Sequence, residues 1–588
     1  MRRENLKLED FLNRLYFGDC LDVLKLLARE SKAGFIDCIY IDPPFNSNRN
    51  YNVLFEDVAT KDAKAQKQAF ADTWSNVSYL DTLNEIKSND LDIFNFLSAL
   101  DNIRVPKSAV SYLTTMSIRI YYMHTILKET GSFYLHCDPV MSHYLKLLCD
   151  LIFGNQHFHS EIIWRRTNSH NKLTGQYGPI HDVILFYSKS STYKFHPGTR
   201  PYSKEYITSR FVHSDTNGIY QTNYLTGPGV RNGESGTEWK GFNPTSNGRH
   251  WAIPKSLLQF LPDNFESLGT IEKLDALLTK ELIVFPKKAG GQPMYKQYIG
   301  PGVFYQDIWA YQPNTSGVLY QSKECIDEDV KYLENEDEIL GYPTQKPVGI
   351  LKRILETSTD EGDLVADFFC GCGTTIAAAQ ELKRNWIGAD ISHLATRLIT
   401  KRLVDIYGIG IRKTFEAFGF PRDIASAREL SEKTESGRLK FQDWVIEVLL
   451  GGVSNPKKTA DGGWDGHITF ATPKKKEVVL IEVKSGNVNV KNVREFIQVV
   501  NKQDAAIGLF VCFEEMVTKP MLHDAKECGH FGLFKNCDKI QVVTIEDLLN
   551  GKLPNIPESR ISQFRTAEPM SLYGDESSQA SLFDKDEE

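Results

Sequence analysis

The chain has 588 residues, which allows about two to four domains of ordinary size. Hydrophobic residues make up 41% of it and charged residues 24%, a globular composition that excludes collagen-like, low-complexity and wholly disordered proteins. No apolar run approaches the ~18–20 residues of a membrane span, and the N-terminus lacks the apolar core of a signal peptide. We therefore expect a cytoplasmic protein with no membrane partner.

The formal net charge of −8 hides an uneven distribution of charge. Residues 160–260 contain 12 Lys and Arg against 6 Asp and Glu, whereas residues 551–588 contain 4 against 8. Because half of the negative excess lies in this C-terminal tail, it does not mask a basic surface elsewhere. A DNA-binding function is therefore compatible with the acidic total.

The first part of the chain has the pattern of an α/β domain. Apolar positions recur at near-helical spacing over Phe11–Ala28, and Phe35–Ile41 is a short apolar run that reads as a strand. Two prolines after this run end the strand abruptly. The pattern further predicts a helix over Val110–Leu127, a strand over Gly131–His136 and a helix over Leu145–Phe153.

The sequence changes character after Ser160. Predicted strands, Glu161–Arg165 and Val183–Tyr187, alternate with polar stretches that are rich in Gly and Asn. Asn223–Arg249 is one such stretch, and it interleaves Trp, Tyr, Arg and Lys. This middle part of the chain is therefore expected to be rich in loops.

Regular periodicity returns near Gly341. A strand over Leu364–Phe369, a glycine-rich turn, a helix over Ile376–Leu382 and a strand over Trp386–Ala389 form a β-turn-α-β unit that ends at Asp390. The polar segment 413–440 is interpreted as a linker, and 441–550 as a separate, smaller α/β domain. Residues 551–588 have the composition of a disordered acidic tail.

The glycine-rich turn is the first candidate site. It begins at Asp367, within the strand predicted over Leu364–Phe369, and runs through Gly371 and Gly373 to Thr374. Glycines let a backbone pass close to a ligand, and the start of the next helix supplies free N–H groups. Asp390, after the following strand, can accept hydrogen bonds from ribose hydroxyls. Many α/β proteins use such glycines only for a tight turn.

The second candidate site is the tetrapeptide Asp42-Pro43-Pro44-Phe45 at the end of the first predicted strand. A carboxylate beside a rigid turn can accept hydrogen bonds from an exocyclic amino group, and a phenyl face can stack on a flat ring. Enzymes that act on a base in DNA extrude it and hold it by such contacts. For a lone tetrapeptide, the plain end of a strand is the usual explanation.

Together the two sites resemble the amino-group DNA methyltransferases that use S-adenosylmethionine, in their circularly permuted β arrangement. In that family the catalytic (D/N/S)-P-P-(Y/F/W) motif comes first, a target-recognition region follows and the cofactor motif comes last. The further matches are Gly18-Asp19-Cys20-Leu21, His181–Lys189, Asp307-Ile308-Trp309, Tyr342–Pro347 and Arg353. The resemblance covers about Tyr16 to Asp405, and departs at Cys370 and Cys372, where small residues are commoner.

The resemblance implies a Rossmann-like methyltransferase domain over 1–412, with an inserted target-recognition region over 160–302. It implies methyl transfer to an exocyclic nitrogen of double-stranded DNA in a restriction-modification system, with a homodimer as one arrangement. The implied catalytic residues are Asp42, Pro43, Pro44 and Phe45. The implied cofactor residues are Asp367, Phe369, Gly371, Gly373, Thr374, Asp390, Lys346 and Pro347. Asp at the first motif position favours adenine N6 over cytosine N4, for which Ser is commoner.

The 441–550 segment resembles the Mrr-like form of the PD-(D/E)-x-K nucleases. Asp465, Glu482 and Lys484 stand at the motif positions, and Glu447 matches an acid that some members carry on a helix. Asp465, Glu482 and Glu447 would bind Mg²⁺, with Lys484 beside the attacked phosphate. Two alternatives stay open: a methyltransferase whose C-terminal domain only binds DNA or a partner, and a non-enzymatic DNA-binding scaffold.

The tail contains Gln579-Ala580-Ser581-Leu582-Phe583 within a polar, acidic segment. This pattern resembles the pentapeptide that binds the bacterial sliding clamp, in which two apolar residues dock in a groove and a glutamine fixes the register. Five residues match by chance often, and tails tolerate stray apolar residues.

Overall fold

The computed structural model describes residues 13–31, 33–44, 79–168, 175, 177–287, 291–333, 338–340, 344–419, 421, 423–432, 435–455, 462–471, 476–532, 537–550 and 552–557. Phe45 and the Gln579–Phe583 pentapeptide lie outside the described residues. The chain divides into two compact units: Met1–His196 with Asp307–Ala310 and Asp329–Glu588, and Pro197–Gln306 with Tyr311–Glu328. Within the described ranges, no helix is both long and apolar enough to cross a membrane.

The first unit is built on a nine-stranded sheet in the order β14-β4-β5-β3-β2-β15-β16-β1-β17. In sequence order these strands are β1 (Asn13–Phe17), β2 (Ile36–Ile41), β3 (Leu127–Cys137), β4 (Phe158–Arg165), β5 (His181–Ser188), β14 (Ile308–Trp309), β15 (Leu364–Asp367), β16 (Asn385–Asp390) and β17 (Phe415–Phe418). Among these described strands only β5 runs antiparallel to its neighbours. The predicted α/β fold is confirmed.

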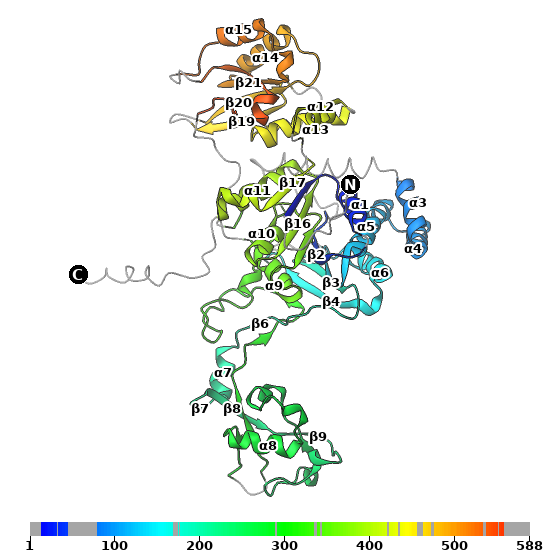
Figure 1. The fold of residues 1–588 in the computed structure, drawn as a ribbon, viewed down its shortest axis with the longest axis vertical. Coiled ribbons are helices and arrows are strands. Elements are labelled where there is room, and N and C mark those ends of the chain that lie inside the picture. Colours follow the sequence, from blue (N-terminus) through cyan, green and yellow to red (C-terminus); the bar gives the residue numbers. More distant parts are fainter. Residues whose placement is uncertain are drawn as a thin grey trace, which may run out of the picture. The chain divides into compact units, whose positions relative to one another are not determined.

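Helices cover both faces of this sheet. Figure 1 shows α1 (Cys20–Glu30), α5 (Lys107–Ile126) and α6 (Ser142–Phe153) on one side, and α9 (Val348–Ser358), α10 (Thr374–Glu381) and α11 (His393–Tyr407) on the other. Two further helices, α3 (Tyr79–Asn89) and α4 (Leu91–Asn102), pack against α5. This arrangement is a doubly wound, mostly parallel sheet, in which ligands bind at the carboxyl ends of the strands.

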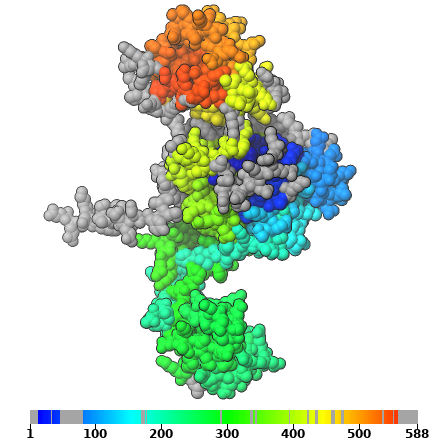
Figure 2. Space-filling view, viewed as in Figure 1, coloured from blue at the N-terminus to red at the C-terminus, as the bar shows by residue number. Residues whose placement is uncertain are grey.

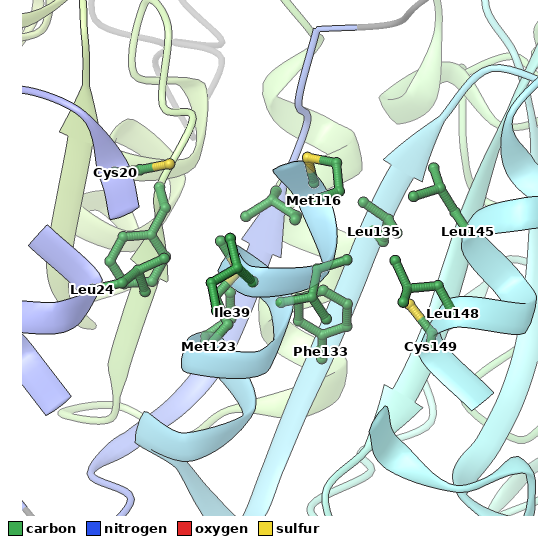
Figure 3. Close-up of a cluster of buried hydrophobic side chains, with 14 of the residues drawn as sticks. Cys20, Leu24, Ile39, Met116, Met123, Phe133, Leu135, Leu145, Leu148 and Cys149 are labelled. Atoms are coloured by element: carbon green, nitrogen blue, oxygen red, sulfur yellow. The ribbon is translucent and has the colours of Figure 1, made fainter. Parts of the chain in front are cut away.

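Strand alternation separates an apolar face from a polar one. Ile39 of β2 and Phe133 and Leu135 of β3 point into the core beneath α5 and α6, where Figure 3 shows them among Met116, Met123, Leu145 and Leu148. The alternate residues of the same strands, among them Tyr40 and His136, therefore lie on the opposite face. The core beneath α5 and α6 consists mainly of apolar side chains, whereas Tyr40 and His136 lie on the side of the sheet that α9 covers.

The structure of the N-terminal segment differs from the helix that its apolar periodicity suggests. Phe11–Ala28 has near-helical spacing, yet Asn13–Phe17 is the strand β1 and only Cys20–Glu30 is helical. Gly18 has φ +145° and Asp19 caps the helix through its side chain, so the chain breaks between them. Strand β1 forms because it inserts between β16 and β17, with parallel pairing to both.

The second unit is a smaller body made of two chain segments, which have green colours in the space-filling view (Figure 2). It contains α7 (Lys204–Arg210), α8 (Thr270–Thr279) and a four-stranded sheet of β7 (His213–Asp215), β8 (Gly218–Tyr224), β11 (Ile283–Val284) and β12 (Met294–Tyr298). Short strand pairs join β9 (Thr226–Pro228) with β10 (Arg249–Trp251) and β6 (Thr199–Arg200) with β13 (Val303–Phe304). Trp239, Trp251, Leu274 and Leu277 lie in its core.

The predicted insertion, 160–302, needs correction at both ends. β4 and β5 pair with each other and β5 pairs with β3, so both strands belong to the main sheet and the unit begins only at Pro197. At its other end, the chain first contributes β14 to the main sheet and then forms part of the second unit again over Tyr311–Glu328. A sequence pattern does not reveal which sheet a strand joins.

The predicted linker over 413–440 is wrong, because this segment is folded. β17 joins the main sheet, where Phe418 stacks on Tyr16 with ring centroids 4.8 Å apart. The helices α12 (Ile424–Glu432) and α13 (Glu435–Asp443) follow, and Ala427 is buried in the core of the C-terminal domain. The segment is polar overall, so its few buried apolar residues, such as Phe418 and Ala427, gave no periodic signal in the sequence.

The C-terminal domain has its own five-stranded sheet in the order β18-β19-β20-β21-β22. The strands are β18 (Val453–Ser454), β19 (Gly466–Ala471), β20 (Lys476–Val483), β21 (Ile507–Cys512) and β22 (Ile540–Thr544), with helices α14 (Val490–Lys502), α15 (Lys519–Glu527) and α16 (Ile545–Leu549). A π-helix over Trp444–Leu449 continues α13. β18, β19 and β20 are antiparallel, and β20, β21 and β22 are parallel. The smaller C-terminal α/β domain of the predicted fold class is present.

Candidate active site

Residues from four distant segments meet at the carboxyl edge of the main sheet. Strands β2, β15, β16 and β1 are adjacent and parallel, so the residues that follow them share one edge. Asp42 follows β2, the glycine turn follows β15, Asp390 ends β16, and Gly18 follows β1. The Gly18 N–H donates to the Asp390 carbonyl over 3.0 Å. The two candidate sites of the sequence therefore lie on neighbouring strands.

The glycine turn is held by Asp367, which is 2% exposed. Its Oδ2 accepts from Thr375 Oγ1 at 2.5 Å and its Oδ1 from the Phe369 N–H at 3.0 Å. Burial nevertheless raises the pKa of Asp367 to about 7. Gly371 and Gly373 have φ of +47° and +77°, a region that L side chains rarely adopt. The turn is thus a tight, preformed loop that leads into the N-terminus of α10.

Asp390 fixes the same turn from the neighbouring strand. Its Oδ2 accepts from the Gly371 N–H at 2.9 Å and its Oδ1 from the Ser392 N–H at 2.8 Å. Burial raises the pKa of this carboxyl to about 6, although both hydrogen bonds oppose the shift. Each carboxylate oxygen has two lone pairs, so Asp390 retains acceptor capacity for the hydroxyls of a ribose.

Asp42 forms an ion pair with Lys346, whose Nζ donates to Asp42 Oδ2. Both side chains are mostly buried, and the Lys346 carbonyl accepts from Thr374 Oγ1 at 3.2 Å. Pro347 follows as the N-cap residue of α9. Lys346 and Pro347 are predicted as cofactor residues, yet the side chain of Lys346 reaches the carboxylate predicted to hold the target base.

A buried polar chain crosses the sheet beside Asp42. The Tyr40 hydroxyl lies 2.8 Å from His136 Nδ1, and His136 Nε2 lies 3.4 Å from Asp182 Oδ2. Arg166 Nε is 3.0 Å from Asp182 Oδ1. Burial acts to raise the pKa of Asp182, but the hydrogen bond and charge of His136, with the charge of Arg166, bring the pKa below its ordinary value. Sequence reasoning missed this chain, although the His181-Asp182 match could have indicated one member.

Asp19 is a second acidic residue that the sequence prediction did not assign. Its carboxylate caps α1 through the Leu21 N–H and accepts from Arg119 Nη2 at 2.8 and 3.0 Å. Arg119 is itself buried and also donates to Cys20 Sγ at 3.1 Å. The Gly18-Asp19 motif was the available signal. This ion pair fixes the loop after β1 at the edge that carries Asp390.

The C-terminal domain brings three predicted residues together. Gly466 pairs with Ile481 in antiparallel register, so Asp465 and Glu482 lie side by side where β19 begins. Asp465 Oδ2 accepts from the Val483 N–H at 2.7 Å, and Lys484 Nζ lies 2.6 Å from Glu482 Oε1. Glu447 lies on the π-helix and is half-buried. Within the described residues, no group of three or more His, Cys, Asp or Glu could hold a metal ion.

Two family models match the chain. One, described as DNA methylase, matches residues 36–401, and one, described as NACHT-associated inactive Restriction Endonuclease 1, matches residues 439–550. The first match spans more than half of the chain. The second falls on the domain that carries Asp465, Glu482 and Lys484.

Curated relatives include restriction-modification proteins. The Type II methyltransferase M.EcaI of Enterobacter cloacae is 32% identical over 294 residues, which is 50% of this chain and 57% of that protein. The Type III restriction-modification enzyme StyLTI Mod subunit of Salmonella typhimurium is 26% identical over 380 residues, 63% of this chain and 50% of that protein. The chain thus spans about half the length of these relatives. The crystal structure of the M1.HpyAVI-SAM complex matches with a TM-score of 0.28 and 13% identity, covering 66% of this chain and 99% of that one.

Proposed function

The chain belongs to the DNA methylase family, and from this premise we propose that it transfers a methyl group from S-adenosylmethionine to an exocyclic amino group of double-stranded DNA. The observation that carries the proposal is the shared sheet edge of Asp42 and the Gly371–Gly373 turn. A carboxylate suited to an amino group and a turn suited to a nucleoside ligand stand on adjacent strands.

The residues present fit the cofactor. Gly371 and Gly373 have positive φ angles that favour glycine, so the loop carries no side chain at these two positions. The first N–H groups of α10 have no acceptor within the helix, and Asp390 can accept from ribose hydroxyls. S-adenosylmethionine, when bound, supplies a methyl group that its sulfonium already activates. We propose Asp367, Phe369 and Thr374 as the remaining contacts of this pocket.

The protein's task is then to orient the amino group. Asp42 would accept one N–H, and the Pro43 carbonyl another, so that the nitrogen lone pair faces the methyl donor. Transfer would join the nitrogen to the methyl carbon as the carbon–sulfur bond breaks, with S-adenosylhomocysteine as the leaving group and the surplus proton of the nitrogen passing to water. Pro43 and Pro44 keep this turn rigid, and Phe45 is proposed to stack on the extruded base.

We propose adenine N6 as the methylated atom. The support is the aspartate at position 42, because related enzymes that act on cytosine N4 more often carry serine there. Digestion of modified plasmid followed by mass spectrometry distinguishes the two products. N4-methylcytosine as the sole product would refute the adenine assignment but not methyl transfer itself.

The decisive test is Asp42→Ala. Purified protein is incubated with plasmid and S-adenosylmethionine, methylated positions are read by sequencing, and cofactor affinity is measured by calorimetry. We expect Asp42→Ala to abolish methylation and to change cofactor affinity by no more than a few-fold. Asp92→Ala, an exposed carboxylate on α4, is the matched control and should remain active. Full activity of Asp42→Ala would overturn the proposal.

A second candidate activity is Mg²⁺-dependent DNA cleavage by the C-terminal domain. Its support is the adjacency of Asp465 and Glu482 with Lys484 beside them, since Mg²⁺ often binds one or two carboxylates and keeps several waters. The matching family is described as inactive, which supports the alternative of a domain that binds DNA or a partner without cutting. Plasmids of each methylation state, incubated with and without Mg²⁺, distinguish cleavage from binding alone.

The homodimer is a further prediction, and light scattering on the full chain tests it.

A further inference from the structure

We propose that Lys346 is a positioning residue of the target-base pocket: its ammonium holds one oxygen of Asp42 and leaves the other as the acceptor for the target amino group. The inference rests on the proposed function and changes the role of Lys346, which the sequence assigns to the cofactor. It also explains why one residue contacts both half-sites.

The contacts of Asp42 support this role. Lys346 Nζ donates to Oδ2, and within the described residues no other hydrogen bond to the Asp42 side chain is present. The side chain of Lys346 is 12% exposed and that of Asp42 is 16% exposed. At this depth water screens the pair only partly, so the ion pair restricts the carboxylate more than a surface pair would.

A carboxylate without such a partner samples a broad range of χ2. Fixing Oδ2 against an ammonium removes this freedom before the base arrives, and Oδ1 then faces the pocket as one acceptor. Charge-assisted hydrogen bonds are also stronger than neutral ones. The ammonium further offsets the negative charges at this edge, where Asp42 and Asp390 both act to raise the pKa of Asp367.

The main chain of Lys346 is tied to the cofactor side. Thr374, the first residue of α10, donates from Oγ1 to the Lys346 carbonyl at 3.2 Å. Two residues later the Val348 N–H donates to Glu338 Oε1 at 2.7 Å, which fixes the start of α9. Lys346 therefore has its backbone on the glycine turn and its ammonium on Asp42. A lysine stem, which is long and unbranched, spans this distance.

The test compares two DNA duplexes that carry the recognition sequence found by methylation sequencing. One has the target adenine, and the other has purine 2′-deoxyriboside at that position, which lacks only the 6-amino group. Affinities are measured with the full chain and S-adenosylhomocysteine, so no reaction occurs. Because a hydrogen bond to a charged group is strong, wild type should prefer adenine by at least about tenfold.

Three variants are compared. Lys346→Met keeps the stem and removes the charge, Lys346→Arg keeps the charge, and Lys352→Met is the matched control. Lys352 lies on α9, is similarly buried and is paired with Glu381 at 2.5 Å. We expect Lys346→Met to lose most of the preference for adenine and to lower kcat, while KM for S-adenosylmethionine stays within about twofold. Lys346→Arg should retain part of the preference and Lys352→Met all of it.

Two results would overturn the inference. If Lys346→Met keeps the preference for adenine but binds S-adenosylhomocysteine more weakly, Lys346 is a cofactor-binding residue and the inference is wrong. A stronger preference in Lys346→Met would mean that the lysine competes with the base for Asp42. If sequencing finds no methylated base at all, the proposed function fails, and if it finds only methylated cytosine, the adenine assignment fails; both results precede the comparison of variants and are distinct from a failure of the Lys346 inference. Unaltered thermal unfolding of Lys346→Met confirms that the variant is folded.

Discussion

Gly373→Ala should destabilise the first unit by an amount that follows from two features of the turn. Gly373 has φ +77° and ψ +34°, which costs an L residue roughly 1–2 kcal/mol. A Cβ at this position would lie 2.5 Å from Ile399 Cγ1 on α11, closer than any real contact. Overpacking of this kind costs about 1–3 kcal/mol. The expected loss in the free energy of unfolding is therefore about 2–5 kcal/mol.

Gly362→Ala is the matched control. Gly362 has φ +85° in the turn before β15, and an added Cβ would meet no heavy atom within 4 Å. Only the backbone term of roughly 1–2 kcal/mol applies there. Urea unfolding followed by circular dichroism measures both losses, and calorimetry measures S-adenosylmethionine affinity. We expect Gly373→Ala to weaken cofactor binding and Gly362→Ala to leave it unchanged. Equal losses and equal affinities would refute the reasoning about the turn.

Three further predictions follow from the described residues and the tail. Burial raises the pKa of Asp367 from 3.8 to about 7. As the pH rises, the unfolded chain therefore loses this proton at a lower pH than the folded chain does. The free energy of unfolding should fall as the pH rises from about 3.8 to about 7. Asp367→Asn should flatten this fall in urea unfolding, and an unchanged pH profile would contradict the assignment. If wild type cleaves DNA with Mg²⁺, Lys484→Ala should not; cleavage by that variant would exclude Lys484 from the reaction. A labelled Asp575–Glu588 peptide should bind the host's sliding clamp and lose binding with Leu582→Ala or Phe583→Ala; no saturable binding at high micromolar concentration would end this idea.

Local patterns predicted most of the main sheet. Gly131–His136 and Trp386–Ala389 lie within strands of the structure, and Phe35–Ile41 matches β2 except at Phe35, because a strand buried on both faces is a short apolar run bounded by turn residues. The sequence also predicted the tight turn at Gly371 and Gly373, because the positive φ angles of such a turn favour glycine. The family assignment followed from the joint presence of that turn and the Asp42 tetrapeptide, and the matching family model confirms it.

Contacts between distant segments could not be predicted. Strand β1 is stabilised by β16, where Asn13 Oδ1 accepts the Trp386 N–H at 2.8 Å across 373 positions. Asp42 and Lys346 are 304 positions apart. Neither distance leaves a periodic signal, so the first segment resembled one helix and the sequence did not indicate the pairing of Asp42 with Lys346. The polar 413–440 segment was misread for the same reason, because its few apolar residues pack against β1 and the C-terminal core.

The same long-range contacts explain how an inserted unit can sit between the two halves of one site in the sequence without separating them. The chain leaves the first unit after His196 and returns to it at β14 and again at Asp329. Arg353 of α9 secures both returns: its guanidinium lies 5.4 Å from the Trp309 ring centroid and donates twice to the Asp329 carboxylate at 2.5 Å. Because α9 begins directly after Lys346 and Pro347, the helix that anchors the insertion is also the helix that follows the residue paired with Asp42. Strand order, rather than chain order, therefore keeps the residues proposed to bind the base and those proposed to bind the cofactor at one sheet edge.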